Sequence, residues 1–222
     1  MNTVTNTKEH LYNTVKAEIL DLELKPGVRI SEAEVAKRLG VSRQPIRELF
    51  IRLTHDKLVQ VVPQKGTFIS LIDLDYVKQV IYMRFLVEKN ILQEACDKLD
   101  DADIEKLKDI CDSQTAIAED GGDPIEFLRA DNSLHRTIFH MCGHDVIWSI
   151  IESNNVNYSR FRLLDVLEKD IMHRIVKQHR KIIELIETKN KSGLKELLEE
   201  HLYQGLDNSE HIIDRYKEYF SK

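Results

Sequence analysis

The chain reads Leu39-Gly40-Val41-Ser42-Arg43-Gln44-Pro45-Ile46-Arg47-Glu48-Leu49 within its first quarter. Gly40 and Val41 are typical of a tight turn between two helices. Ser42 can cap the following helix, because a serine oxygen accepts a hydrogen bond from the unpaired N–H groups of a first turn. Pro45 is tolerated there, since the N–H it lacks would be unpaired anyway. The stretch therefore predicts a helix that presents basic residues in its opening turns.

Two further helices are expected upstream of this turn. Apolar residues at spacings of four, four and three predict a helix from about His10 to Glu23, which Lys25-Pro26-Gly27 ends. Ser31 and Glu34 form a capping box, in which each side chain satisfies a free backbone N–H at the start of the next helix. The turn at Gly40 therefore joins two helices, as in a helix-turn-helix.

A hairpin is expected after the basic helix. The β-branched runs at 58–62 and 67–70 flank the turn sequence Pro63-Gln64-Lys65-Gly66. We interpret this hairpin as a wing. Residues 1–72 are accordingly predicted to form a winged helix-turn-helix DNA-binding domain.

The charges of the chain are divided between its two parts. The net charge is -6, which taken alone argues against a nucleic-acid partner. Residues 1–72, however, hold 11 basic residues against 8 acidic ones, whereas residues 73–222 hold 21 against 30. A mildly basic head on an acidic body is expected when only the head meets DNA.

Residues 73–222 read mainly at helical period and predict an all-α bundle, so that the whole chain is mainly α. No stretch approaches the roughly 18 apolar residues of a membrane helix, and the start lacks a signal-peptide pattern, so we expect a cytoplasmic protein with no membrane partner. The three cysteines form no CxxC and suit reduced, packed thiols. The expected helices span about 73–98, 101–119, 124–140, 145–165, 169–189 and 192–220.

The basic helix carries the residues expected to read DNA. Arg43 and Arg47 lie four apart on one face, with Gln44 beside them. Arginine can bind guanine and glutamine can bind adenine through paired hydrogen bonds. Two exposed arginines can also merely solvate a helix, but the order of capped helix, glycine turn, basic helix and hairpin favours DNA binding.

The body contains a possible metal site formed by Asp131, His135, His179 and His201. Asp131 and His135 are four apart and share a helix face, while the other two histidines come from the last two predicted helices. Three imidazoles and a carboxylate suit zinc best, with nickel, cobalt or manganese as alternatives. A histidine taken alone is more often a surface or core residue, so the prediction depends on the set.

The segment 39–49 resembles the recognition segment of the GntR family of bacterial regulators. In that family the matching serine, two arginines and the wing glycine contact operator DNA, which implies Ser42, Arg43, Arg47 and Gly66; Gln44 and Lys65 are weaker candidates. One departure is Ala33, where many relatives have an arginine at the start of the preceding helix.

The body is similar to the FCD ligand-binding domain of the FadR-type subfamily, whose metal-binding members use an Asp-x3-His pair and two later histidines. The resemblance implies a pocket in which the metal coordinates a small organic acid. Arg84 and Glu88 match a recurrent Arg-x3-Glu pair; Arg84 either binds the ligand carboxylate or only pairs with Glu88. Asn157, with Asn154 and Tyr158, is a candidate for the pocket wall. Six body helices would favour the VanR-like branch.

These features predict a homodimeric regulator, a repressor rather than an enzyme, whose two heads bind a pseudo-palindromic operator and respond to a carboxylate effector. One alternative is a metal-dependent hydrolase, although no HExxH motif accompanies the histidines and the winged head would be unexplained. A sensor of the metal itself is a second alternative. A purely structural metal is a third.

Overall fold

The computed structural model describes residues 2–168 and 170–221. It divides into two compact units: a head made of residues up to Leu74 together with those from Ile213 onward, and a body of residues 75–212. Each unit is described by itself. No helix in the described part of the chain is long and apolar enough to cross a membrane.

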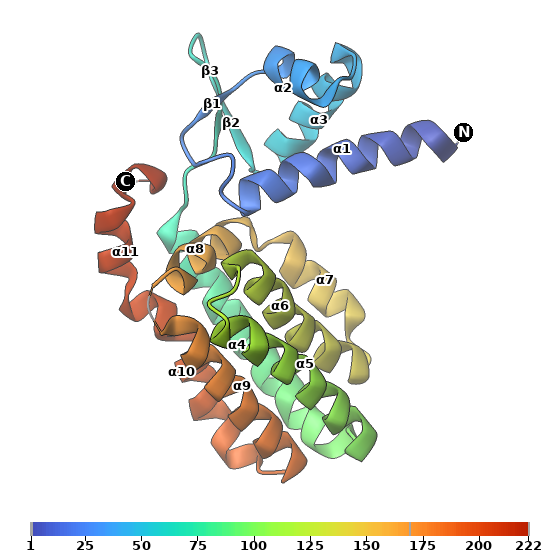
Figure 1. The fold of residues 1–222 in the computed structure, drawn as a ribbon, viewed down its shortest axis with the longest axis vertical. Helices are drawn as coiled ribbons and strands as arrows, with labels where there is room; N and C mark the ends of the chain where they lie inside the picture. The colour runs from blue at the N-terminus through green and yellow to red at the C-terminus, as the bar shows by residue number, and fades with distance from the viewer. Residues whose placement is uncertain (1, 169, 222) are drawn as a thin grey trace. The chain divides into compact units, whose positions relative to one another are not determined.

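The head is a winged helix-turn-helix, which confirms the predicted fold (Figure 1). Two strands of its sheet form the predicted hairpin, with Val59 opposite Ile69 and Val62 opposite Gly66. A third strand, missed in the sequence, pairs with the second hairpin strand, which becomes the central strand in the order β1-β3-β2. The head comprises α1 (Asn2–Leu20), β1 (Arg29–Ile30), α2 (Glu32–Leu39), α3 (Arg43–His55), β2 (Val59–Val62) and β3 (Gly66–Ile69).

The ends of the head helices correct two expectations. α1 ends at Leu20 and not near Glu23, and Leu22 adopts a left-handed backbone conformation with φ of 60°, which cannot continue a helix. Ser42 lies at the N-cap position of α3, but its side chain makes no capping hydrogen bond. Ser31 does cap α2, accepting from the N–H of Glu34 at 3.2 Å.

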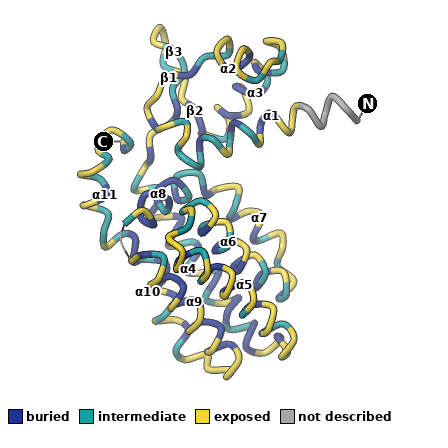
Figure 2. Tube along the Cα trace, viewed as in Figure 1, coloured by how far each residue is buried: buried dark blue, intermediate teal, exposed yellow. Residues whose placement is uncertain are grey.

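The body is an all-α bundle with the buried residues on the inner helix faces (Figure 2). It contains more helices than the six predicted, because two predicted helices are broken. The helix expected over 145–165 divides at Asn154 and Asn155, and the one expected over 192–220 is interrupted at Asn208. The expectation of six helices, and its use to favour the VanR-like branch, is therefore not met. The helices are α4 (Leu74–Lys98), α5 (Asp101–Glu119), α6 (Pro124–Met141), α7 (Asp145–Ser153), α8 (Val156–Val166), α9 (Ile171–Glu187), η1 (Lys191–Gly193) and α10 (Leu194–Asp207).

The chain returns to the head after α10. α11 (Ser209–Arg215) and η2 (Lys217–Tyr219) bring Phe220 into a parallel bridge with Ile72. The N–H of Ile72 donates to the carbonyl of Tyr219 at 2.7 Å, and the N–H of Ser221 donates to the carbonyl of Ile72 at 2.9 Å. The last residues therefore complete the head, which the expected division at 72/73 did not foresee.

Candidate metal centre and nucleic-acid interface

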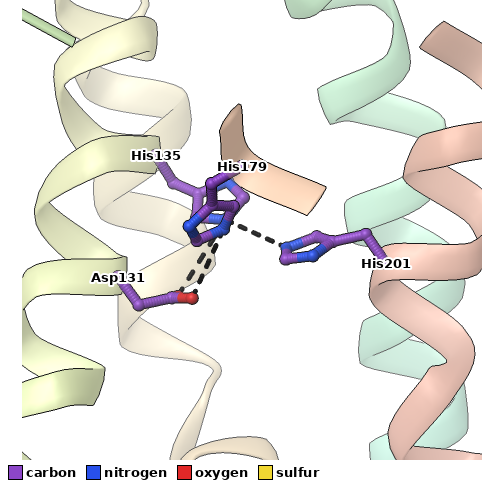
Figure 3. A group of neighbouring side chains, drawn as sticks. All are labelled: Asp131, His135, His179 and His201. Atoms are coloured by element: carbon purple, nitrogen blue, oxygen red, sulfur yellow. Dashed lines mark hydrogen bonds and ion pairs between the residues drawn. The ribbon is translucent and has the colours of Figure 1, made fainter. Parts of the chain in front are cut away.

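The four predicted ligands converge inside the body (Figure 3). α6 supplies Asp131 and His135 from successive turns, α9 supplies His179 and α10 supplies His201. Their ligand atoms all lie within 4.8 Å of one another, and all four residues are buried. The geometry is that of a set able to hold one ion between three helices.

A second layer of side chains fixes the orientation of each imidazole. The Nδ1 atom of His135 lies 2.9 Å from Glu88, that of His179 lies 2.7 Å from Gln114, and that of His201 lies 3.0 Å from Gln178. Each of these partners is an oxygen, which requires a proton on Nδ1 and leaves the Nε2 lone pair available. This arrangement is the one that orients metal-binding histidines in proteins.

The centre of the cluster contains polar atoms that lack ordinary partners. Among the described residues, Asp131 Oδ1 and His179 Nε2 lie 3.5 Å from each other, and both are buried without a hydrogen bond. The Nε2 atoms of His135 and His201 face each other at 3.4 Å. Unpartnered buried acceptors are costly, and facing lone pairs repel unless a proton or cation lies between them. The residues therefore fit a bound metal ion.

The protonation states also suit metal binding. Burial lowers the pKa of His179 to about 3, and burial together with the neighbouring histidines holds the pKa of His201 well below its usual value. Burial alone would raise the pKa of Asp131, but Arg162, which donates to Oδ2 at 2.7 Å, helps hold it well below the usual range. Neutral imidazoles and an ionised carboxylate are the forms that bind metals.

Arg84 fits both interpretations made from the sequence. Its Nε donates to Glu88 at 2.5 Å, and both side chains are almost fully buried. Its Nη1 and Nη2 are buried with no hydrogen-bond partner in the described part of the chain, and its guanidinium lies 5.0 Å from the ring centre of Tyr158. Although burial opposes ionisation of Glu88, Arg84 and His135 lower its pKa to about 2. The ion pair therefore uses only part of the guanidinium.

A small cavity adjoins the cluster between α8 and α10. Tyr158, Arg162 and His201 are among its lining residues, and its volume is about 20 Å³, which is room for roughly one water. Asn157 is not among the lining residues; its Oδ1 accepts a hydrogen bond from Arg160 at 3.0 Å. Asn154 is exposed at the end of α7. Of the three residues suggested for the pocket wall, the structure places only Tyr158 there.

The second layer was not foreseen in the sequence, except that Glu88 was named as a partner of Arg84. Gln114 lies on α5 and Arg162 on α8, whereas the groups they contact lie on α9 and α6. Helical spacing relates residues within one helix and carries no signal for contacts between helices. Gln178 likewise reaches across to α10, where it meets His201.

The candidate DNA-binding residues of α3 lie on its exposed side. Ser42, Arg43, Gln44 and Arg47 are exposed, whereas Ile46, Leu49, Phe50 and Leu53 are buried against the head. Gln44 donates to Glu48 at 3.3 Å. The helix therefore shows a polar, basic face that a DNA groove can receive.

The wing adds a cation that the sequence analysis missed. Lys65 is exposed in the turn, and Gly66 has φ of 116°, in the region that favours glycine. A Cβ at Gly66 would come within 2.9 Å of Nε of Arg29, an exposed residue of β1. Glycine therefore allows the Arg29 guanidinium to lie against the wing tip. The isolated two-residue strand β1 gave no signal for this placement.

A winged helix-turn-helix joined to a helical body with a buried Asp-His cluster defines a two-domain transcriptional regulator. Residues 7–69 match the model described as "Bacterial regulatory proteins, gntR family", and residues 79–204 match the FCD domain. The chain belongs to the GntR family and carries an FCD domain. The family predicted from segment 39–49 and from the Asp-x3-His pair is thereby confirmed.

Several relatives align over nearly the whole chain. A regulator in an unstable DNA locus of Streptomyces ambofaciens is 30% identical over 98% of this chain and 90% of its own length. The transcriptional repressor RspR of Escherichia coli is 22% identical over 100% of this chain and 97% of its own. The E. coli McbR structure has a TM-score of 0.75 at 19% identity and covers 94% of this chain and 98% of McbR, which supports the fold.

Proposed function

We propose that this regulator is a homodimeric repressor that binds operator DNA through its winged heads and responds to a small organic acid held beside a divalent metal, with zinc as the first choice. The observation that carries the proposal is the convergence of three histidine Nε2 atoms and Asp131 on one point, with every Nδ1 atom fixed by an oxygen. Bound zinc would supply Lewis-acid coordination positions for a carboxylate oxygen.

The charges around the cluster favour an anionic effector. Asp131 and Glu88 are balanced by Arg84 and Arg162, so these four groups are neutral together, and a divalent cation outweighs the one further carboxylate in the cavity lining, Asp165. With a divalent cation present, the buried site carries net positive charge and attracts an anion. The free Nη atoms of Arg84 offer a further contact to an anion.

The size of the cavity explains how an effector would be coupled to structure. Room for about one water cannot hold an organic acid, so the acid must displace side chains on α8 and α10 as it enters. The acid would bind the form with displaced side chains more tightly than the form with the small cavity, and would so shift the populations of the two forms. A coupling of about 1 to 3 kcal/mol between acid binding and DNA binding changes operator occupancy several-fold or more.

On the DNA side, the proposed contacts are made by α3 and the wing. Ser42, Arg43 and Arg47 would meet bases and phosphates, with Gln44 as a further base contact, while Lys65, Gly66 and Arg29 would meet the DNA beside the wing. The repressing role is proposed from the similarity to the repressor RspR, and the dimer on a two-fold operator from the usual symmetry of such regulators.

Fluorescence anisotropy tests the proposal directly. The full chain is titrated onto labelled DNA from upstream of its own gene and onto random DNA, at two salt concentrations, with bound metal assayed before and after chelation. We expect saturable, salt-sensitive binding that prefers the upstream DNA. The absence of preference for any segment across that region would contradict the DNA-binding role, and a sedimentation mass of one chain would contradict the dimer.

The small cavity also favours a second candidate, a sensor of the metal itself. A site that closes around one ion and about one water needs no organic ligand to change state. This candidate predicts that operator affinity follows metal concentration in buffer free of organic acids. A chelation response that appears only when an acid is present would instead support the effector proposal.

A further inference from the structure

The cavity beside the metal centre is lined by two chemically different pairs of polar residues. One pair of lining residues, the cation Arg162 and the candidate ligand His201, contacts the metal cluster. A second pair, Asp165 and Gln204, also lines the cavity, and the acceptors Asp165 Oδ1 and Gln204 Oε1 are buried with no hydrogen-bond partner among the described residues. The lining is therefore not suited to a plain carboxylate alone, because Asp165 and Gln204 call for a hydrogen-bond donor.

These acceptors are held in place by the packing of α8 against α10. Asp165 and Gln204 are 4% and 6% exposed, so bulk water does not satisfy them. A Cβ at Gly205 would lie 3.1 Å from Oδ2 of Asp165 and 3.3 Å from Phe161, which shows how closely the helices approach there. Leaving buried acceptors unpaired is costly, and two in one cavity mark a place for a donor.

We propose that the effector carries a hydrogen-bond donor next to its carboxylate, as in a 2-hydroxy or 2-amino acid, and that Asp165 and Gln204 recognise this donor. The inference rests on the proposed function, which supplies the carboxylate end at the metal and Arg162. A hydroxyl or ammonium group then takes the position of the single water for which the cavity has room, and satisfies acceptors that a plain acid would leave unpaired.

Matched acids test the inference. Zinc-loaded full-length protein is titrated calorimetrically with three series that differ only in the donor: acetate, glycolate and glycine; propionate, lactate and alanine; succinate, malate and aspartate. We expect at least one donor-bearing acid to bind about tenfold or more tightly than its parent acid. The hydroxy and amino members of each series separate the two sources of the donor.

Two variants at one position test the residue assignment. Gln204→Met removes the acceptor at similar length, and Gln204→Glu keeps an acceptor there. We expect the preference for the donor-bearing acid to fall to about twofold in Gln204→Met and to persist in Gln204→Glu. Bound zinc and the melting temperature are measured for both, so that a folding defect is recognised.

The outcomes separate this inference from the function on which it rests. Equal binding of parent and donor-bearing acids overturns the inference and leaves the carboxylate effector in place. Binding of no acid in any series overturns the effector proposal together with the inference. If Gln204→Met still binds zinc and keeps the full preference for the donor-bearing acid, Gln204 does not recognise the donor and its assignment is overturned.

Discussion

The head and the body of this protein differ in whether their polar side chains are exposed or buried. Among the described residues, the buried polar and charged side chains all lie in the body, from Arg84 to Gln204, while the head buries only apolar side chains and Tyr12. The basic residues of α3 and the wing are exposed. Exposed charge serves an external partner and buried, partly unsatisfied charge serves an internal one, so the two units separate recognition of DNA from recognition of a ligand.

The largest effect should come from removing one of the four candidate metal-binding side chains of the body. His179→Ala removes one of the nitrogen atoms proposed to bind the metal. We therefore expect the gain in unfolding free energy on adding metal, about 2.7 kcal/mol at a metal concentration a hundredfold above Kd, to disappear. Thermal unfolding with and without zinc measures it. His140→Ala is the control, because His140 is exposed on the same helix and pairs with Asp145. Equal stabilisation of both variants by zinc would argue against the site.

The head should lose operator affinity without losing stability. Arg47→Ala removes an exposed cation from α3 and is expected to cost about 1 to 3 kcal/mol in specific binding, with no change in melting temperature. Anisotropy on upstream DNA measures the effect. Arg180→Ala, a body residue at an exposed ion pair with Asp112, is the matched control. Unchanged operator affinity in Arg47→Ala would exclude this residue from the interface.

The metal-free body should be sensitive to mild acid. His179 has a pKa of about 3 in the folded chain against 6.5 when unfolded, so between these values the unfolded chain binds a proton that the native chain does not. Stability is therefore complete above pH 6.5 and falls below it, by up to about 1.4 kcal/mol per pH unit for each such group. Urea unfolding in chelator from pH 7 to 5 measures the slope, and His179→Gln should reduce it, with the remaining slope due to His201. If the unfolding free energy of the wild-type protein does not change over this pH range, the histidines are not buried in their neutral form.

The smallest effect is expected at the wing. Arg29→Gln should weaken binding to specific and random DNA alike and reduce the slope of log affinity against log salt by about one, as expected for a phosphate contact. Arg29→Lys keeps the charge and should retain most of the slope. If the slope is the same in all three proteins, Arg29 makes no ionic contact with DNA.

What the sequence could predict depended on whether the signal lay within one element. The spacing of Asp131 and His135 and the order of the later histidines predicted the cluster of four side chains, and Gly40 predicted the helix turn. Contacts between elements, such as His179 with Gln114, have no periodic signature. The break of the long predicted helix at Asn154 was missed because apolar residues continue at helical spacing on both sides of it.

The bridge between Ile72 and Phe220 has a consequence for synthesis of the protein. The segment that closes the head leaves the ribosome only after every residue of the body has been made, because translation runs from the N-terminus. Helices α1 to α3 and the hairpin emerge first, but Ile72 lacks its hydrogen bonds to the Tyr219 carbonyl and from the Ser221 N–H until those residues have been made. The head is thus completed only after the whole body has been made.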